Sequence, residues 1–176
     1  DQKNTAINSR QRLTDGSNRF YFEPMTLKSH GVDAEISGKL TDAWQLFAGY
    51  SYNTRKYTAS IGSIEKGSSF NKQTPKHMLR LYTSYRLPGA AEKWTVGLGM
   101  STQSSTSSGW DVKNGGHTLW NANVQYKPTK DLNIGVGINN LTDKRYYENH
   151  GIRAHGWGNF YGEPRNVMLS VKWELK

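Results

Sequence analysis

The sequence contains no cysteine among its 176 residues, which excludes disulfide bridges and thiolate metal sites. No apolar run approaches the ~18 consecutive residues of a membrane-spanning helix, and only 35% of the residues are hydrophobic. The sequence therefore predicts no transmembrane helix. A transmembrane β-barrel stays open, because alternation of apolar and polar residues dilutes the hydropathy of each strand.

Motifs of enzyme active sites are missing as well. The sequence holds no nucleophile elbow, no phosphate loop and no zinc-binding helix motif. Asp33 and Glu35 lie two residues apart, and polar lining of a lumen accounts for them better than a catalytic pair does. We therefore expect no enzymatic activity. The start, Asp1-Gln2-Lys3-Asn4, lacks the charged and then apolar pattern of a signal peptide, and we interpret it as a cut inside a larger protein.

The formal net charge of +9 raises the question of an anionic partner. Nucleic acid, anionic lipid and an acidic ligand are the candidates. The cations are scattered through expected turns and loops, for example at Lys56, Lys66, Lys93 and Lys127. A dispersed pattern is typical of solvated surface, so nucleic acid is not an expected partner.

What the sequence does contain is alternation with a period of two residues. In residues 166–175, Val167, Leu169, Val171, Trp173 and Leu175 alternate with a mostly polar set that Met168 alone interrupts. In residues 132–139 the polar set is glycine and asparagine, which a packed soluble core would not require. These patterns predict strands with one face toward lipid and the other toward water. Similar runs are expected at residues 20–40, 44–53, 77–86, 94–101 and 119–126, and residues 1–10 add part of a further strand. A bulge or bend is expected in the first of these runs, at Pro24 and at Ser29–Gly31.

The connections between these runs alternate between short and long. Tight turns are expected at 41–43, 88–92 and 128–131, and long polar segments at 57–75, 104–116 and 142–162. Outer-membrane barrels have this asymmetry, with short periplasmic turns and long extracellular loops. The sequence therefore predicts an all-β, antiparallel, up-and-down transmembrane barrel wall of about 7–8 strands.

Aromatic residues on the apolar rows support this prediction. A first group lies beside the short turns: Trp44, Tyr85, Trp94, Tyr126 and Trp173. Tyr50, Tyr52 and Trp120 are candidates for a second group at the opposite end. Rings at both membrane interfaces form the aromatic girdles of such barrels.

Several motifs resemble those of the TonB-dependent outer-membrane receptors. Asn139 to Tyr147, NNLTDKRYY, is similar to a signature near the end of these receptors, and Gly162 to Ser170 resembles their closing G-x-P-R-N-x-x-L-S segment. TPKH at 74–77, LPG at 87–89 and GYSY at 49–52 also match, in the family's order. The resemblance covers about residues 31 to 176.

This resemblance implies that residues 1–176 form the C-terminal segment of the β-barrel domain of a 22-stranded receptor, without its plug domain. Such a receptor would lie in the outer membrane of a Gram-negative bacterium and would import ferric siderophores of the hydroxamate or pyoverdine type. The implied partners are the ferric siderophore, outer-membrane lipid and lipopolysaccharide, the rest of the receptor, TonB acting through the plug, and the barrel-assembly machinery. Leu175 stands where the family usually ends on an aromatic residue, so Trp173 would have to supply the cue for assembly.

The resemblance also points to ligand-binding residues in the long loops. Tyr161 ranks first, because some hydroxamate-siderophore receptors contact their ligand with an aromatic residue near this position. The other candidates are Trp157, Phe160, Trp110, Tyr147 and Arg153. Aromatic rings suit the flat, partly apolar surface of a chelate, and cations attract an acidic chelate or the phosphates of lipopolysaccharide. Packing of the rings against each other, and solvation of Arg145 and Arg153, are the alternatives.

His150, His155 and Glu148 invite a metal site, but their loose spacing in one loop does not favour it. We expect no protein-bound metal and no intrinsic cofactor, since the siderophore itself saturates its iron.

Two other classes stay open. The chain could be a self-contained, eight-stranded porin-like or structural barrel, or a soluble basic β-domain that binds nucleic acid or sugar. Detergent dependence would separate the soluble domain from the two membrane classes. The count of strands favours a fragment of a larger barrel, because residues 1–10 offer only part of an eighth strand.

Overall fold

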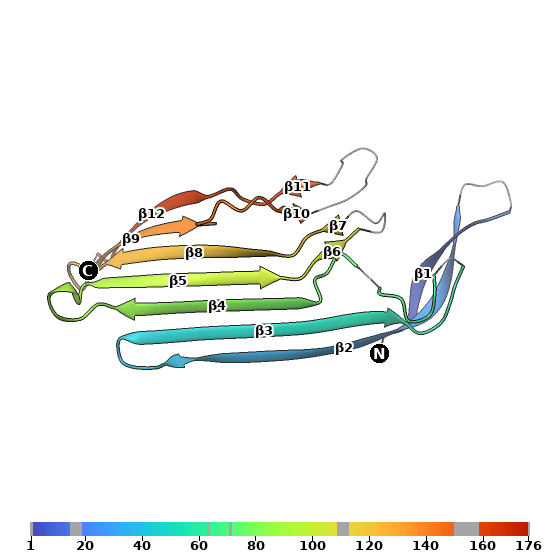
Figure 1. Cartoon of the computed structure of the whole chain (residues 1–176), viewed down its shortest axis with the longest axis horizontal. Coiled ribbons are helices and arrows are strands. Elements are labelled where there is room, and N and C mark those ends of the chain that lie inside the picture. The colour runs from blue at the N-terminus through green and yellow to red at the C-terminus, as the bar shows by residue number, and fades with distance from the viewer. Residues whose placement is uncertain are drawn as a thin grey trace.

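The computed structural model describes residues 2–14, 19–62, 64–70, 72–108, 113–149 and 159–175, and in these ranges the chain is almost entirely β-structure. One antiparallel sheet contains eight strands in the order β1-β2-β3-β4-β5-β8-β9-β12 (Figure 1). Its strands are β1 (Gln2–Arg12), β2 (Phe20–Lys39), β3 (Trp44–Tyr57), β4 (His77–Arg86), β5 (Trp94–Gln103), β8 (His117–Tyr126), β9 (Leu132–Asn139) and β12 (Asn166–Trp173). The all-β, up-and-down prediction is confirmed.

The connections follow the predicted alternation. Short connections span residues 40–43, 87–93 and 127–131, and the middle one contains the 3₁₀ turn Gly89–Ala91. Long connections lie at the opposite end of the sheet (Figure 1). They carry two small hairpins, β6 (Thr106–Ser107) with β7 (Lys113–Asn114), and β10 (Tyr147–Asn149) with β11 (Phe160–Tyr161). The sheet therefore has a short-turn end and a long-loop end.

The apolar row of β12 lies on the outside of the sheet. Val167, Leu169, Val171 and Trp173 are 66%, 71%, 64% and 70% exposed, on an edge strand whose intervening residues are exposed as well. Each pairs with an apolar residue of β9, from Val167 opposite Ile138 to Trp173 opposite Leu132. A soluble domain would bury such a row, because each exposed aliphatic side chain forgoes about 1.5–3 kcal/mol of hydrophobic stabilisation in water. The row is suited to lipid instead.

The opposite face of the sheet is polar. Tyr82 donates a hydrogen bond to Asn123 Oδ1 over 3.2 Å, from β4 across β5 to β8. Gly97 lies beneath this bond, and a Cβ there would clash with the Asn123 side-chain oxygen. Asp33 and Glu35 of β2 face Ser51 and Gly49 of β3 in the same polar row. The glycines of this face make room for polar side chains that cross the inner surface.

The predicted aromatic group is present at the short-turn end. Trp44 pairs with Tyr85 across β3 and β4, and its indole N–H donates to Thr83 Oγ1 over 2.7 Å. Trp94 stacks on Tyr126, with ring centroids 4.4 Å apart. At the other end of the outer face, the Tyr50 hydroxyl lies 2.8 Å from His77 Nδ1. Rings with one polar atom thus border the apolar band at both ends, as at membrane interfaces.

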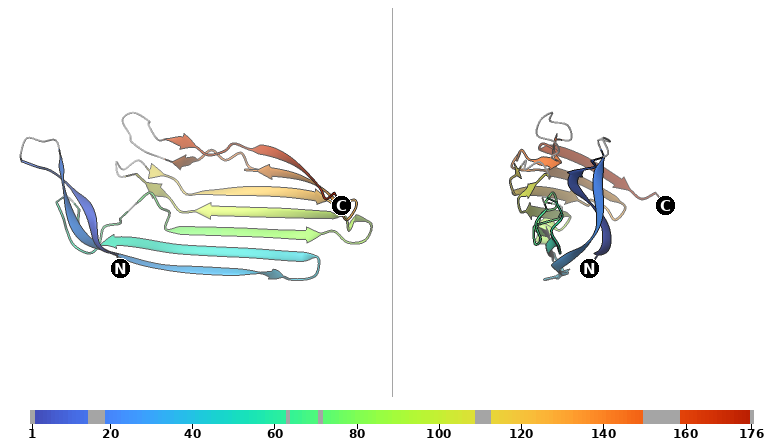
Figure 2. Two further views of the ribbon diagram at one scale, coloured as in Figure 1. Left: turned by 180° about the vertical axis from the view of Figure 1, so that it is seen from behind. Right: turned by 90° about the vertical axis from the view of Figure 1, so that its right-hand side faces the viewer.

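The hairpin of β1 and β2 extends beyond the wall at the long-loop end (Figures 1 and 2). The pairing of β2 with β3 runs without interruption from Leu27 to Lys39, so β2 has no bulge at Ser29–Gly31. The register between β1 and β2 does shift between Met25 and Leu27, close to the predicted irregularity at Pro24. The chain instead changes direction where β2 exchanges β1 for β3 at Leu27. Within the described ranges the buried hydrophobic side chains are Ile7, Met25, Leu27 and Ile64, and they form one cluster at this place. The wall itself has no hydrophobic core.

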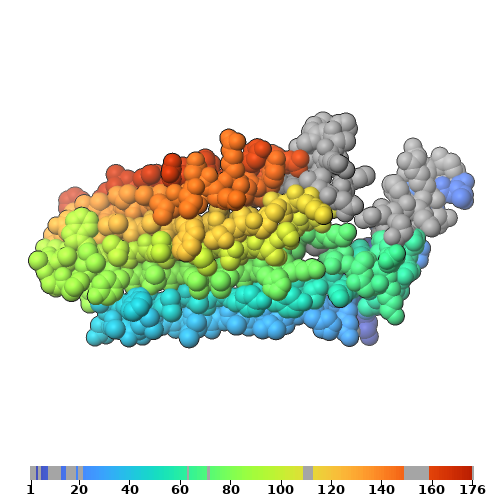
Figure 3. Space-filling model, viewed as in Figure 1, coloured from blue at the N-terminus to red at the C-terminus, as the bar shows by residue number. Residues whose placement is uncertain are grey.

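The sheet is open. β1 and β12 are its two edges and do not pair with each other in the part of the chain that is described (Figure 2). The space-filling view shows the strands as a continuous slab (Figure 3). These observations disfavour both a self-contained eight-stranded barrel and a soluble domain. Within the described ranges, no helix has the length and apolarity needed to cross a bilayer.

Candidate functional site

The turn that follows β9 fixes the long-loop end of the last two wall strands. Asn140 is 3% exposed and has a φ of 49°. Its Nδ2 donates to the carbonyls of Lys144 and Glu163, over 2.9 Å and 3.0 Å, and its Oδ1 accepts from the Lys144 amide over 2.8 Å. Asparagine tolerates the left-handed conformation better than most residues, and here its amide also serves three partners.

The two motifs that carry the family resemblance meet at this turn. Asp143 Oδ1 accepts a hydrogen bond from the Arg165 amide over 3.0 Å. Tyr146 lies directly over Gly162, where any side chain would clash with the ring, and the Gly162 amide donates to the Tyr146 carbonyl over 3.0 Å. Tyr146 also packs against His117, with centroids 4.4 Å apart. The segments before and after the third long connection are thereby held together.

Beyond this turn, β10 and β11 bring two predicted ligand-binding residues into contact. Tyr147 pairs with Tyr161, and their rings stack with centroids 4.6 Å apart. The two hydroxyls lie 3.1 Å apart. This hydrogen bond to Tyr161 raises the pKa of Tyr147 above its ordinary value. Tyr161 is 64% exposed, which leaves the pair accessible.

The other predicted residues divide into two groups. Phe160 is 63% exposed and pairs with Asn149, next to the tyrosine pair. Trp110, Arg153 and Trp157 lie outside the described residues, as do His150 and His155 of the disfavoured metal site. Within the described ranges, no cluster of three or more histidine or acidic side chains is placed to hold a metal ion.

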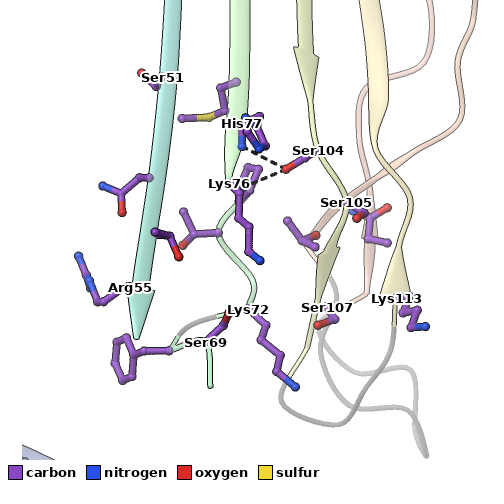
Figure 4. A pocket seen from close by; sticks show the side chains of 18 of the residues that line it. Ser51, Arg55, Ser69, Lys72, Lys76, His77, Ser104, Ser105, Ser107 and Lys113 are labelled. Carbon is purple, nitrogen blue, oxygen red and sulfur yellow. Dashed lines mark hydrogen bonds between the residues drawn. The ribbon is translucent and has the colours of Figure 1, made fainter. Parts of the chain in front are cut away.

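A cavity of about 820 Å³, which we call the basic cavity, lies at the long-loop end between β3, β4 and the hairpin of β6 and β7 (Figure 4). Among the described lining residues, the carboxylate of Asp33 lies with four cationic side chains. They are Arg55, Lys72, Lys76 and Lys113. Serine hydroxyls complete the lining at Ser51, Ser69, Ser104, Ser105 and Ser107. The positive charge and the many donors suit an anionic, oxygen-rich ligand.

Hydrogen bonds between loops build this cavity. Ser104 Oγ accepts from the Lys76 and His77 amides over 3.0 Å and 3.2 Å (Figure 4). The Ser107 amide donates to the Lys72 carbonyl over 2.9 Å, and the Asn53 amide donates to the Lys76 carbonyl over 2.9 Å. Residues of β3, of the connection before β4 and of the connection after β5 are thus held together around the cavity.

A smaller cavity of about 230 Å³ adjoins the tyrosine pair. Its lining includes Tyr147, Glu148 and Arg80, and it shares Met78 with the basic cavity. Asn114, which also lines the basic cavity, donates from Nδ2 to the Tyr147 carbonyl over 2.8 Å. The aromatic pair and the basic cavity are therefore neighbouring parts of one region.

The sequence pointed to Tyr147 and Tyr161 as separate candidates, without predicting that they stack, and it did not indicate the basic cavity. Its cations come from the end of β3, from the connection to β4 and from β7. They are far apart in sequence, and each taken alone is typical of solvated surface. Only the TPKH motif, which contains Lys76, marked part of this cavity in the sequence.

Comparison with known proteins defines the class. The sequence model of the family described as "TonB dependent receptor-like, beta-barrel" matches residues 1–141, and the chain belongs to this family. Proteins of this family are β-barrels of the Gram-negative outer membrane, so the wall described above is an outer-membrane wall.

Among curated relatives, the chain is 35% identical over 151 residues to the ferric-pyoverdine M114 receptor PbuA of Pseudomonas sp. (strain M114), which covers 83% of this chain and 18% of PbuA. It is 33% identical over 168 residues to the ferripyoverdine receptor of Pseudomonas aeruginosa, which covers 89% of this chain and 19% of that receptor. The chain thus spans about a fifth of the length of these relatives.

The solved structures agree with this class. The structure of P. aeruginosa FpvA in complex with a heterologous ferric pyoverdine matches 97% of this chain and 23% of the FpvA chain, with a TM-score of 0.80 and 29% sequence identity. The open sheet described here therefore has the shape of one sector of a complete receptor barrel.

Proposed function

We propose that this chain forms the C-terminal sector of the barrel of an outer-membrane receptor that binds a ferric siderophore and imports it. Relatives named as ferric-pyoverdine receptors support pyoverdine-type chelates as the substrate class. The observation that carries the proposal is the exposed, stacked pair of Tyr147 and Tyr161 at the long-loop end of an outer-membrane wall. A ring pair of this kind offers a flat apolar surface and hydroxyl groups to a ferric chelate.

In this proposal the whole chain belongs to the barrel domain. The plug, the remaining strands and the contact with TonB come from other residues of the receptor, and energy for import is relayed through TonB. The outward rows contact outer-membrane lipid and lipopolysaccharide. Trp173, exposed on β12, supplies the aromatic cue for the barrel-assembly machinery. Phe160, Trp110, Trp157 and Arg153 are further ligand contacts in the same loops.

The test is uptake of radioactive ferric pyoverdine by cells whose only receptor is the full-length protein. Tyr161→Ala removes both the stacking and the hydroxyl contact, and we expect about two- to tenfold less uptake at low chelate concentration, because an aromatic contact contributes about 0.5–1.5 kcal/mol beyond its buried area. Tyr161→Phe keeps the ring and should lose much less. Phe22→Ala is the matched control, since Phe22 is equally exposed (65%) on the hairpin of β1 and β2.

Two results would contradict the proposal. One is equal uptake by cells with and without the receptor. The other is equal loss from the Tyr161→Ala and Phe22→Ala variants, which would mean that the tyrosine pair has no special part in binding.

A further inference from the structure

We propose that the basic cavity binds a carboxylate on the ferric siderophore, so that the receptor selects acidic ferric chelates over neutral ones of the same shape. This inference rests on the proposed function, because it assigns a charge to the ligand of that same region. It adds a second contact area, separate from the tyrosine pair. In this proposal the cavity binds the charged group of the ligand, and the rings contact the surface of the chelate.

Lys76 is the best-placed cation. Its backbone is fixed on both sides, by Ser104 Oγ at its amide and by the Asn53 amide at its carbonyl. Its side chain is exposed, and no described carboxylate lies within salt-bridge distance of its ammonium group. The main chain is therefore held in place while the ammonium group stays available to a ligand.

Arg55 contributes a more rigid cation on the opposite side of the cavity. Its guanidinium carbon lies 5.7 Å from the centroid of the Phe70 ring, and its side chain is half-buried. Phe70 in turn packs edge-on against Tyr57, next to the buried cluster that contains Leu27. A guanidinium held on a ring is well suited to a carboxylate, because it presents a planar set of donors.

The position of the cavity indicates a ligand at the mouth of the barrel. Much of its lining comes from the connections beyond the ends of the wall strands, among them Ser69, Lys72 and Lys76 after β3 and Ser104, Ser107 and Lys113 after β5. Asn114 lines the cavity and holds the Tyr147 carbonyl, so a chelate against the tyrosine pair has the cavity beside it. The volume of about 820 Å³ lies within the ~300–1,000 Å³ of ligand pockets, enough for one arm of a peptide siderophore.

The charge balance also indicates an anion. Among the described lining residues, the cations of Arg55, Lys76 and Lys113 repel each other. The inter-loop hydrogen bonds hold these cations together despite the repulsion. An incoming carboxylate would lower this repulsion and would gain charge-assisted hydrogen bonds from lysine, arginine and serine.

The experiment uses the purified full-length receptor and two ferric pyoverdines that differ at one group, a side-chain carboxylate in one and the corresponding amide in the other. Calorimetric titration gives a Kd for each. We expect the acid to bind about fivefold more tightly than the amide at low ionic strength, since one exposed ion pair contributes up to about 1 kcal/mol. The preference should shrink in 0.5 M salt, where charges are screened within a few ångströms.

The test variant is Lys76→Gln with Lys113→Gln, two exposed side chains of the cavity. It should lose the preference for the acid and keep its affinity for the amide, which also shows that the receptor is folded. The matched control is Lys93→Gln with Lys130→Gln, which removes the same charge at the short-turn end and should keep the preference.

Each other outcome overturns the inference in a distinct way. Equal binding of acid and amide by the unaltered receptor would remove charge selection and leave the proposed function intact. An equal loss of affinity for both ligands in the Lys76 and Lys113 variant would mean that these lysines stabilise the loops and do not contact the ligand. Binding of neither compound by the unaltered receptor would overturn the proposed pyoverdine substrate class together with this inference.

Discussion

Asn140 donates a hydrogen bond to the main-chain carbonyl of Glu163 over 3.0 Å, which joins the turn after β9 to the segment that enters β12. The contact spans the whole third long connection and links the two motifs that carry the family resemblance. The same side chain serves Lys144 at two further atoms. One buried amide therefore sets where the last two wall strands begin and end.

Removing this amide should destabilise the receptor. Asn140→Gly keeps the left-handed backbone accessible and removes three hydrogen bonds, so we expect a loss of about 2–4 kcal/mol from unpaired polar groups in a buried place. Asn140→Ala should lose about 1 kcal/mol more, because alanine disfavours a positive φ. Chemical unfolding of the purified receptor measures both, with the exposed neighbour Leu141→Ala as control. Unfolding curves identical to those of the control would contradict this account of the turn.

The inner face should tolerate a methyl group at some glycines and reject it at others. Gly97→Ala places a Cβ against the Asn123 amide and the Tyr82 hydroxyl, so both side-chain ends must move and lose their hydrogen bond, and we expect about 1 kcal/mol of destabilisation. Gly137→Ala on β9 meets no atom within 4 Å and should be close to neutral. The comparison uses the same chemical change on the same face, so a similar effect at both positions would refute the close approach at Gly97.

The two faces of the wall should respond differently to an added charge. Val136→Arg places a cation on the outer, apolar row and should cost about 2–4 kcal/mol if that row lies near the middle of the bilayer. Gln125→Arg on the neighbouring strand β8 points to the polar side and should cost much less. Folding yield into lipid vesicles, followed by the gel-mobility shift of folded barrels, separates the two variants. Equal yields would contradict the assignment of the faces.

The buried cluster at the long-loop end should hold the connection at 58–76 against the hairpin of β1 and β2. Leu27 is 1% exposed and packs with Met25 and Ile64. Leu27→Ala leaves a cavity worth about 2–5 kcal/mol, and we expect protease cleavage of the connection at 58–76 while the wall stays intact. Phe22→Ala, at an exposed position of the same hairpin, should leave the cleavage rate unchanged.

The sequence predicted the wall well because each strand meets two different solvents. The alternation at Val167, Leu169 and Val171 indicates that one face of the strand contacts lipid. The lengths of the connections indicate which end of the strands faces which compartment. The segment around Asn140 was singled out only by its resemblance to a motif of the TonB-dependent receptors. Each of these features depends on residues that lie close together in the sequence, so the sequence alone indicates it.

The parts that the sequence did not reveal depend on contacts between distant loops. Lys76 and Lys113 come together only because Ser104 and Ser107 join two long connections. The cluster of Leu27 and Ile64 likewise unites a strand with a loop. A bulge or bend was predicted at Pro24 and at Ser29–Gly31; the register with β1 does shift beside Pro24, whereas the ladder to β3 passes Ser29–Gly31 without a shift.

The most direct test of the outer-membrane wall uses the absence of cysteine in these residues. Single cysteines along β12, from residue 166 to residue 173, carry a spin label in the full-length receptor in lipid vesicles, and its collision rates with oxygen and with a water-soluble nickel complex are measured. Labels at 167, 169 and 171 should collide with oxygen, and labels at 166, 170 and 172 with the nickel complex. A uniform pattern along the strand, or protection of the odd positions from both reagents, would contradict a wall with lipid on one face and water on the other.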